Sequence, residues 1–149
     1  RLADRIAAIA PVAAILTIDP GQPSRPVPVI HIHGTDDKWV PWEPFRHEAI
    51  KFLTIRSVDE TVRTWVRLNG CPPGPNISQV PDRQKDGTTV ERRAYGPGTE
   101  GSEVVLYVIK GGGHTWPGRP PLLELLGRST QDVAANDLIW DFFRKYRLP

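Results

Sequence analysis

The sequence predicts an α/β fold, with a parallel sheet flanked by helices in a single domain. Two short, β-rich apolar runs at 27–33 and 103–109 are typical of strands buried in a parallel sheet. Residues 58–69 and 131–146 carry apolar side chains at helical spacing. Strands that alternate with helices in this order favour a doubly wound sheet. The 149 residues are about the length of one domain.

Composition and charge exclude several classes of function. Nineteen Lys and Arg against 17 Asp and Glu give a net charge of +2, without the basic clusters of a nucleic-acid-binding surface. No apolar run approaches the roughly 18 residues of a membrane-spanning helix. The single Cys71 excludes an internal disulfide framework and a cysteine-based zinc site. The chain has no Met and starts at Arg1, so we expect a processed, shortened or partial sequence.

The N-terminal third holds two predicted strands. Residues 1–5 resemble the last turn of a helix, and the nearly uniform apolar run at 6–14 predicts a buried strand. Pro11 is unusual inside a central strand and is expected to mark the end of this one. A proline-rich loop separates the run from the strand at 27–33. Residues 42–53 are predicted to be partly helical.

A capping box predicts where the next helix begins. Ser57 and Glu60 have the spacing at which each side chain can accept a hydrogen bond from the other residue's backbone N–H. The helix is predicted over 58–69 and ends at Gly70, because glycine readily adopts the left-handed conformation that terminates helices. Its inward face would carry Val62, Trp65, Val66 and Leu68.

A hairpin and a further strand follow. Residues 77–95 alternate between apolar and polar side chains, and Asp86-Gly87 within them is a strong signal for a hairpin turn. The strand at 103–109 then leads into three glycines before His114. These glycines would let the backbone turn tightly where the strand ends.

The last predicted element is a long helix over residues 131–146. Ser129 or Thr130 is expected to cap it, because both side chains can accept a hydrogen bond from the first turn. Its apolar face would carry Leu138, Ile139, Phe142 and Phe143.

Two predicted strands end in loops that carry acid and base side chains. The strand at 27–33 runs into Asp36 and Asp37, and the strand at 103–109 runs into His114. In open α/β sheets, ligand sites form beyond the carboxyl ends of the strands. An acid followed along the chain by a histidine is also the order of the last two members of an α/β-hydrolase triad. There the acid orients the imidazole, which takes and returns a proton.

Several ordered segments carry a resemblance to a known family. HIHGTDDKWVPW (31–42), SVDETVRTWVRLNGC (57–71) and EVVLYVIKGGGHTWPG (103–118) resemble the polyhydroxybutyrate depolymerase and feruloyl esterase family of α/β-hydrolases. The opening RLADRIAAIAPVAA and the terminal DLIWDFF also resemble that family. The resemblance implies that residues 1–149 are the C-terminal portion of a single α/β-hydrolase domain, with a small hairpin excursion. It also implies a secreted or cell-envelope location.

The resemblance assigns roles to four residues. Asp37 matches the catalytic acid of the family's HGTxDxxVP pattern and His114 matches the general base, while Asp36 is a second candidate acid. Trp116 and Trp42 would wall a substrate groove. Neither a cofactor nor a metal is implied.

The implied function is a serine carboxylic-ester hydrolase, of the polyhydroxyalkanoate depolymerase or feruloyl or acetyl esterase type. The nucleophilic serine of a G-x-S-x-G turn is expected upstream of Arg1, because none of the serines in the chain lies in such a turn. The expected partners are therefore an ester substrate and the N-terminal half of the same domain, with no nucleic acid and no membrane. The chain alone is expected to be inactive.

Two alternatives and one departure from the family's pattern stay open at this point. A non-catalytic α/β module that binds a carbohydrate or polyester surface would keep the same fold without turnover. His31 and His33 point to one face of a strand and could bind a metal, although hydrogen bonding in the core is the favoured interpretation. The family also pairs the cysteine of LNGC with a cysteine in a YGxC stretch, where this chain has Gly98, which leaves Cys71 unpaired.

Overall fold

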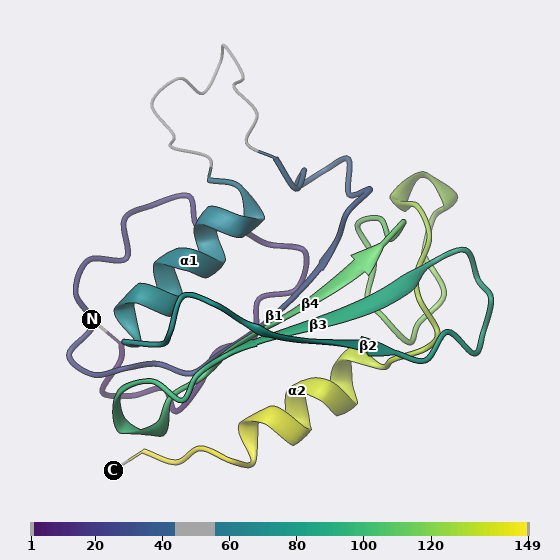
Figure 1. Cartoon of the computed structure of the whole chain (residues 1–149). Coiled ribbons are helices and arrows are strands. Elements are labelled where there is room, and N and C mark those ends of the chain that lie inside the picture. Colours follow the sequence, from purple (N-terminus) through teal and green to yellow (C-terminus); the bar gives the residue numbers. More distant parts are fainter. Residues whose placement is uncertain (1, 44–55, 149) are drawn as a thin grey trace.

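A computed structural model describes residues 2–43 and 56–148, which form a mixed sheet with a helix on each face (Figure 1). The strands are β1 (Val29–Gly34), β2 (Asn76–Val80), β3 (Thr89–Tyr95) and β4 (Val104–Lys110), in the spatial order β1-β4-β3-β2. β1 and β4 are parallel, whereas β3 is antiparallel to both of its neighbours. The predicted α/β class is confirmed, but among these four strands only β1 and β4 form a parallel pair.

The predicted strand at 6–14 is present only in part. The segment runs parallel to β1, but among the described residues its pairing is limited to two isolated bridges, at Ile9 and at Val12. Pro11 lies between the bridges and has no N–H to donate, and Ala13 adopts a left-handed φ of 49°. A continuous ladder cannot run through such a break. The segment is therefore not a regular strand.

The other two N-terminal predictions have different outcomes. Residues 2–5 form one turn, in which the Arg5 N–H donates to the Leu2 carbonyl at 2.9 Å. This turn is not assigned as helix in the described residues, so the predicted helix end stays a prediction. The partly helical segment predicted at 42–53 lies outside the described residues except for its first two positions.

Helix α1 (Val58–Leu68) begins at the predicted capping box. The Glu60 N–H donates to Ser57 Oγ at 3.0 Å, and the Ser57 N–H donates to Glu60 Oε2 at 2.8 Å. Gly70 follows the helix with a φ of 62°, as its predicted stop requires. α1 covers one face of the sheet, where its valines join a buried cluster with Val29, Val104, Leu106 and Val108.

The hairpin of β2 and β3 is confirmed, but its turn is wider than predicted. Residues 81–88 connect the two strands, so Asp86 and Gly87 lie within a loop and not in a two-residue turn. The Asp86 carboxylate accepts hydrogen bonds from the Thr88 N–H at 3.0 Å and from the Gln131 N–H at 2.7 Å. The contact with Gln131 binds the loop to the C-terminal segment.

Helix α2 (Ala135–Phe143) is shorter than the predicted helix at 131–146. The carboxylate of Asp132 accepts hydrogen bonds from the N–H groups of Arg83 and Gln84, at 2.8 and 3.0 Å. The hairpin loop thus holds the residues expected to form the first helical turn. α2 begins without a side-chain cap, so the capping role predicted for Ser129 or Thr130 is wrong.

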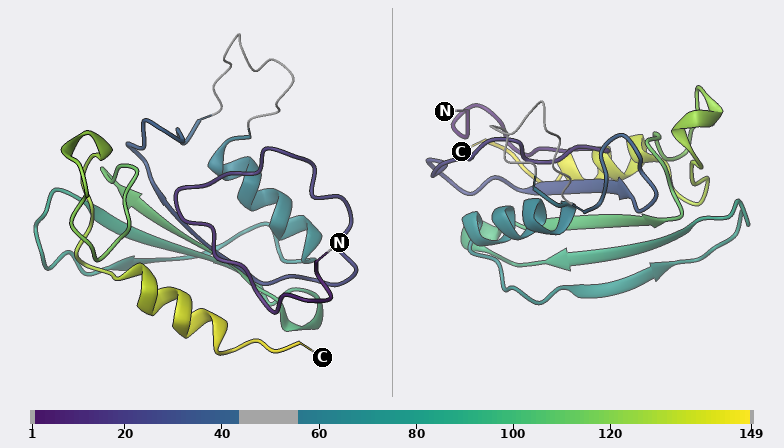
Figure 2. Two further views of the ribbon diagram at one scale, coloured as in Figure 1. Left: turned by 180° about the vertical axis from the view of Figure 1, so that it is seen from behind. Right: turned by 90° about the horizontal axis from the view of Figure 1, so that it is seen from above.

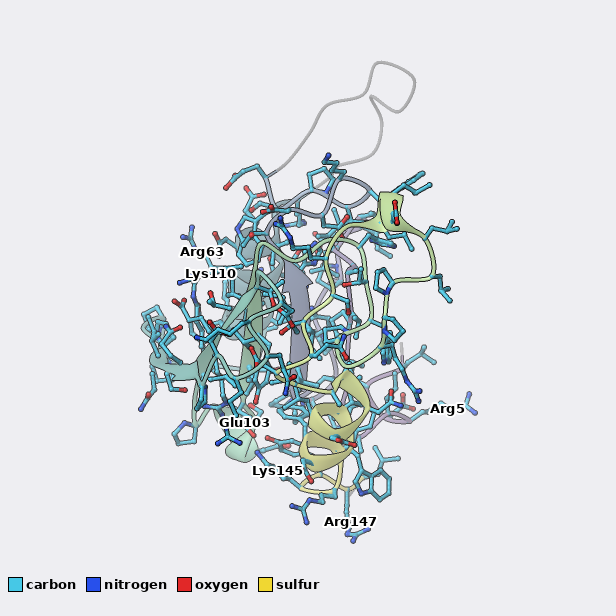
Figure 3. All side chains as sticks on the ribbon, turned by 90° about the vertical axis from the view of Figure 1, so that its right-hand side faces the viewer. Arg5, Arg63, Glu103, Lys110, Lys145 and Arg147 are labelled. Carbon is cyan, nitrogen blue, oxygen red and sulfur yellow. The ribbon has the colours of Figure 1, made fainter. Side chains whose placement is uncertain are left out.

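α2 covers the face of the sheet opposite α1 (Figure 2). Its buried Ala135 and Phe142 join a cluster on that face with Ile30, Ile32, Val90, Val105 and Ile109. Beyond the helix, Lys145 Nζ and Tyr146 Oη both donate to Glu103 Oε1, at 3.0 and 2.7 Å. Figure 3 shows Lys145 and Glu103 on adjoining parts of the molecule. These contacts attach the end of the chain to the start of β4.

The only cysteine lies at the corner after α1. Cys71 is a free, buried thiol whose Sγ lies 3.9 Å from the Ser102 carbonyl oxygen. Gly98 lies directly opposite, since a Cβ added to it would be 2.7 Å from Cys71 Sγ. Gly98, the position at which the sequence resemblance predicts a second cysteine, thus faces Cys71. Two short 3₁₀ helices, η2 (Thr99–Gly101) and η3 (Glu124–Leu126), flank β4 in the sequence.

Candidate active site

Asp37 is held by the turn that follows β1. Its Oδ1 accepts hydrogen bonds from the N–H groups of Trp39 and Val40, at 2.9 and 2.8 Å. The side chain is completely buried, so these donors replace the water that a carboxylate would otherwise bind. This turn orients Oδ2 away from its own backbone. Sequence reasoning did not find these two donors, although an aspartate two or three residues before its backbone donors is a common turn pattern.

The loops after β1 and β4 are joined by hydrogen bonds. The Asp36 N–H donates to the Gly112 carbonyl at 2.9 Å, and the Gly111 N–H donates to Thr35 Oγ1 at 2.9 Å. The loops lie so close that a Cβ at Gly34 would overlap the Gly112 carbonyl. The absence of a side chain at Gly34 therefore permits this contact, and the two strand ends form one rigid edge.

His114 completes the predicted pair. Its Nδ1 lies 2.9 Å from Asp37 Oδ2, although the two residues are 77 positions apart in the chain. A carboxylate can only accept, so Nδ1 carries the proton, and in the neutral ring Nε2 presents a lone pair. The backbone is fixed as well, because the His114 N–H donates to the Leu126 carbonyl at 2.8 Å. About a third of the His114 side chain is exposed, so the ring is accessible while Asp37 is not.

Asp36, the second candidate acid, lies outside this pair. Its side chain is exposed, and its Oδ1 accepts a hydrogen bond from Thr35 Oγ1 at 2.9 Å. Of the two adjacent aspartates, only Asp37 has a carboxylate oxygen within hydrogen-bonding distance of His114 in the described structure. The geometry therefore favours Asp37 over Asp36 as the partner of the imidazole.

Two further histidines lie behind Asp37. His31 and His33 are fully buried on β1, with His31 Nε2 and His33 Nδ1 3.3 Å apart. Burial, reinforced by the neighbouring His33, lowers the pKa of His31 to about 3. Burial also lowers the pKa of His33. Both rings are therefore neutral at pH 7, and their mutual hydrogen bond supports the interpretation as core histidines over a metal site.

Within the described ranges, no three His, Cys, Asp or Glu side chains gather as a metal site would require. In the same ranges, no helix is long and apolar enough to cross a membrane.

His114 lines a cavity of about 580 Å³. Val12 and Ala13 also line it, and the loop after His114 contributes the other lining residues, which are mostly apolar. Trp116 is one of these residues and is 43% exposed, and its Nε1 donates to Asn136 Oδ1 at 3.0 Å. The other lining residues are Thr115, Arg119, Pro120, Pro121, Leu122 and Leu126.

Trp42 occupies a different environment from Trp116. It is half-buried against the cluster on the α1 face, and its ring meets His33 edge-on with centroids 6.0 Å apart. Its Nε1 lies 3.3 Å from Asp59 Oδ2, to which it donates. The structure thus places Trp116, but not Trp42, on the wall of the cavity beside His114.

Comparisons with known proteins find similarity to two curated proteins, whereas no known family description matches the chain. The chain is 29% identical over 153 residues to the "Putative esterase NocK" of Nocardia uniformis subsp. tsuyamanensis, covering 91% of this chain and 44% of that protein. It is 28% identical over 156 residues to feruloyl esterase B of Piromyces equi, covering the whole chain and 24% of that protein. The chain thus spans less than half the length of either relative, and both relatives carry the name esterase.

Proposed function

We propose that this chain supplies the acid and the base of a serine carboxylic-ester hydrolase. The observation that carries the proposal is the 2.9 Å contact between Asp37 Oδ2 and His114 Nδ1, with the other ring nitrogen free to act as a base. Similarity to two proteins named as esterases supports the same class of reaction. In this proposal Asp37 is the acid of the triad and His114 is the general base.

The geometry suits each step of acyl transfer. Nε2 of His114 takes the proton of a serine hydroxyl as its oxygen attacks the ester carbonyl. The buried Asp37 carboxylate stabilises the imidazolium that forms, because its negative charge lies beside Nδ1 and away from solvent. The imidazolium then gives its proton to the leaving alcohol. A water molecule then attacks the acyl group on the serine in the same way, with His114 again taking and returning the proton. This second step releases the carboxylic acid product and restores the serine.

The nucleophile is proposed to come from residues beyond this chain. The sequence contains no G-x-S-x-G turn, and the two relatives are each more than twice as long as the part that matches. We therefore propose the N-terminal half of the same domain as the partner that contributes the serine and the oxyanion-binding N–H groups. The secreted or cell-envelope location belongs to the same proposal.

The substrate is proposed to be an ester with an apolar group next to the scissile bond. The cavity beside His114 is lined mainly by apolar side chains, including Trp116. A polyhydroxyalkanoate, a feruloylated polysaccharide and other esters with an apolar acyl or alcohol part fit this description. The proposed contribution of Trp42 is indirect, through its packing against His33.

Hydrolysis of p-nitrophenyl butyrate by the full-length protein tests the proposal. We expect His114→Ala and Asp37→Asn each to lower kcat by about 10³-fold or more, since a triad works as a unit. Asp36→Asn is the matched control, because that carboxylate makes no contact with His114, and it should keep nearly full activity. A fully active His114→Ala variant would refute the proposed base.

A fluorophosphonate that labels activated serines tests the origin of the nucleophile. We expect the label on one serine outside residues 1–149, and no label in the His114→Ala variant. A label within residues 1–149 would refute the upstream nucleophile but not the role of His114. A folded full-length protein that shows neither label nor turnover would favour the non-catalytic binding module.

A further inference from the structure

His33 contacts the loop that holds the proposed catalytic acid. Its Nε2 lies 2.9 Å from the Val40 carbonyl oxygen and 3.7 Å from Asp37 Oδ2. The latter oxygen is the one that pairs with His114. The edge of Trp42 covers the His33 ring, and the side chain is completely buried. His33 therefore lies immediately beside the acid, and it is not among the residues that line the cavity beside His114.

The hydrogen bonds determine which nitrogen of His33 carries the proton. A backbone carbonyl only accepts, so His33 Nε2 must donate to the Val40 oxygen. His33 Nδ1 then holds a lone pair, which accepts from His31 Nε2 at 3.3 Å. His31 thus favours the tautomer of His33 that donates toward the acid loop.

Val40 links this histidine to the acid. Its carbonyl accepts from His33, while its N–H donates to Asp37 Oδ1 at 2.8 Å. A shift of Val40 would move one of the two backbone donors that fix the Asp37 carboxylate. The charged and titratable groups that face His33 are His31, Asp37 and His114. With His33 neutral, its N–H presents a dipole to Asp37 and leaves the carboxylate charge for the imidazolium of His114.

We propose that His33 is a positioning residue that sets the orientation of Asp37 through the Val40 carbonyl, an inference that rests on the function proposed above. It touches neither substrate nor the reacting atoms. Its effect is to keep Asp37 Oδ2 in line with His114 Nδ1 throughout the proton transfer. A displacement of about 1 Å in such a group can cost on the order of 10²-fold in rate.

Two substitutions separate this role from simple packing. In His33→Gln the amide can still donate toward Val40, whereas His33→Leu fills similar space without a donor. We expect His33→Leu to lower kcat about tenfold or more with KM within about twofold, and His33→Gln to retain most of the activity. If His33 only fills the core, the apolar leucine would be tolerated as well as or better than glutamine. Leucine activity equal to or above glutamine activity therefore overturns the proposal.

A measurement on the unaltered full-length protein keeps the test valid if either variant fails to fold. Nitrogen NMR of ¹⁵N-histidine reports which ring nitrogen carries the proton. We expect His33 to be neutral with its proton on Nε2, and to show a scalar coupling across the hydrogen bond to the Val40 carbonyl. A proton on Nδ1, or a charged ring at the pH of maximal activity, overturns the proposal. Loss of activity in His114→Ala is independent of both results, so the two proposals can fail separately.

Discussion

Each oxygen of the Asp37 carboxylate has its own set of contacts. Oδ1 is satisfied by two backbone N–H groups from its own turn, and Oδ2 by the ring of His114. These three donors replace water that a buried carboxylate would otherwise bind. This arrangement separates the two requirements of a triad acid, which must be fixed in place and must also face the imidazole.

The neutral histidines behind Asp37 predict a loss of stability in mild acid. In the unfolded chain His31 has a pKa near 6.5, whereas the folded value is about 3, so the unfolded state binds more protons as pH falls below 6.5. The free energy of unfolding should then decrease by about 2 kcal/mol between pH 7 and pH 5 from His31 alone. Urea unfolding of the full-length protein at both pH values measures this change.

The matched variant is His31→Leu, which removes the titrating group. Its free energy of unfolding should depend less on pH over the same interval, by about the same amount. Carboxylates with lowered pKa values also stabilise the fold, such as Glu91, whose pKa is about 2. They lose that contribution to the free energy of unfolding mainly below pH 5, and so outside the interval from pH 7 to pH 5. If the pH dependence were unchanged in His31→Leu, His31 would not be the group that causes the loss of stability in mild acid.

At the scale of the elements, local signals predicted α1 better than α2. The capping box at Ser57 and the stop at Gly70 act within a few residues, so the sequence contains all the information needed to place α1. The start of α2 depends on Asp132, whose carboxylate binds the distant hairpin loop. No local pattern reveals that contact. A tertiary interaction thus overrode the helical periodicity.

The same distinction applies to the candidate site. Strand periodicity and strand-end loops predicted that an acid after β1 lies near His114, because β1 and β4 are parallel neighbours. The choice of Asp37 over Asp36 rested on the resemblance to the esterase motif. The link from His33 to Val40 could not be predicted, since it depends on how the chain turns after Asp37. The placement of Trp42 on the α1 face was missed for the same reason.

The capping box can be tested directly. Ser57→Ala removes the acceptor of the Glu60 N–H at the start of α1, so we expect a loss of about 1 kcal/mol in the free energy of unfolding. Ser24→Ala, in an exposed loop, is the control and should change stability by less than about 0.5 kcal/mol. Chemical denaturation of the two variants gives the comparison. Equal stability of both would mean that the cap contributes nothing.

The loop after β4 should be intolerant of a side chain at Gly113. A Cβ there would overlap the Leu126 carbonyl, which is the acceptor that fixes the His114 backbone. We expect Gly113→Ala to shift His114 and lower kcat about 10²-fold. Gly74→Ala, which meets no atom within 4 Å, should leave kcat unchanged. Ester hydrolysis tests the loss of activity in Gly113→Ala, and a crystal structure of that variant tests the shift of His114. Full activity in Gly113→Ala would show that the loop can adjust.

At the scale of the whole molecule, the described surface holds several apolar regions. The irregular segment at 6–14 leaves a groove of about 280 Å³ against α1, lined by Ile9, Ile15 and Trp65 among others. Large side chains are also exposed elsewhere, including Ile18, Leu122, Leu123, Leu125 and Trp140. Apolar surface of this extent favours contact with another chain or with further residues of the same protein.

We therefore predict that the 149 residues expressed alone associate or unfold readily. The free side of the 6–14 segment and its groove would pair with other copies, since an uncovered sheet edge promotes association. Size-exclusion chromatography and urea unfolding measure the two outcomes. A monodisperse monomer with a steep, cooperative transition would contradict the prediction.

The free thiol of Cys71 makes the kinetics of opening in the 149-residue chain directly measurable. A reagent must reach the corner between α1 and β4, where the thiol is buried and its pKa is raised by burial. Modification therefore requires the corner to open, because a buried, protonated thiol reacts poorly. With one cysteine in these residues, each modification reports the same event. The rate of labelling without denaturant thus reports how often this corner opens, with no engineered probe.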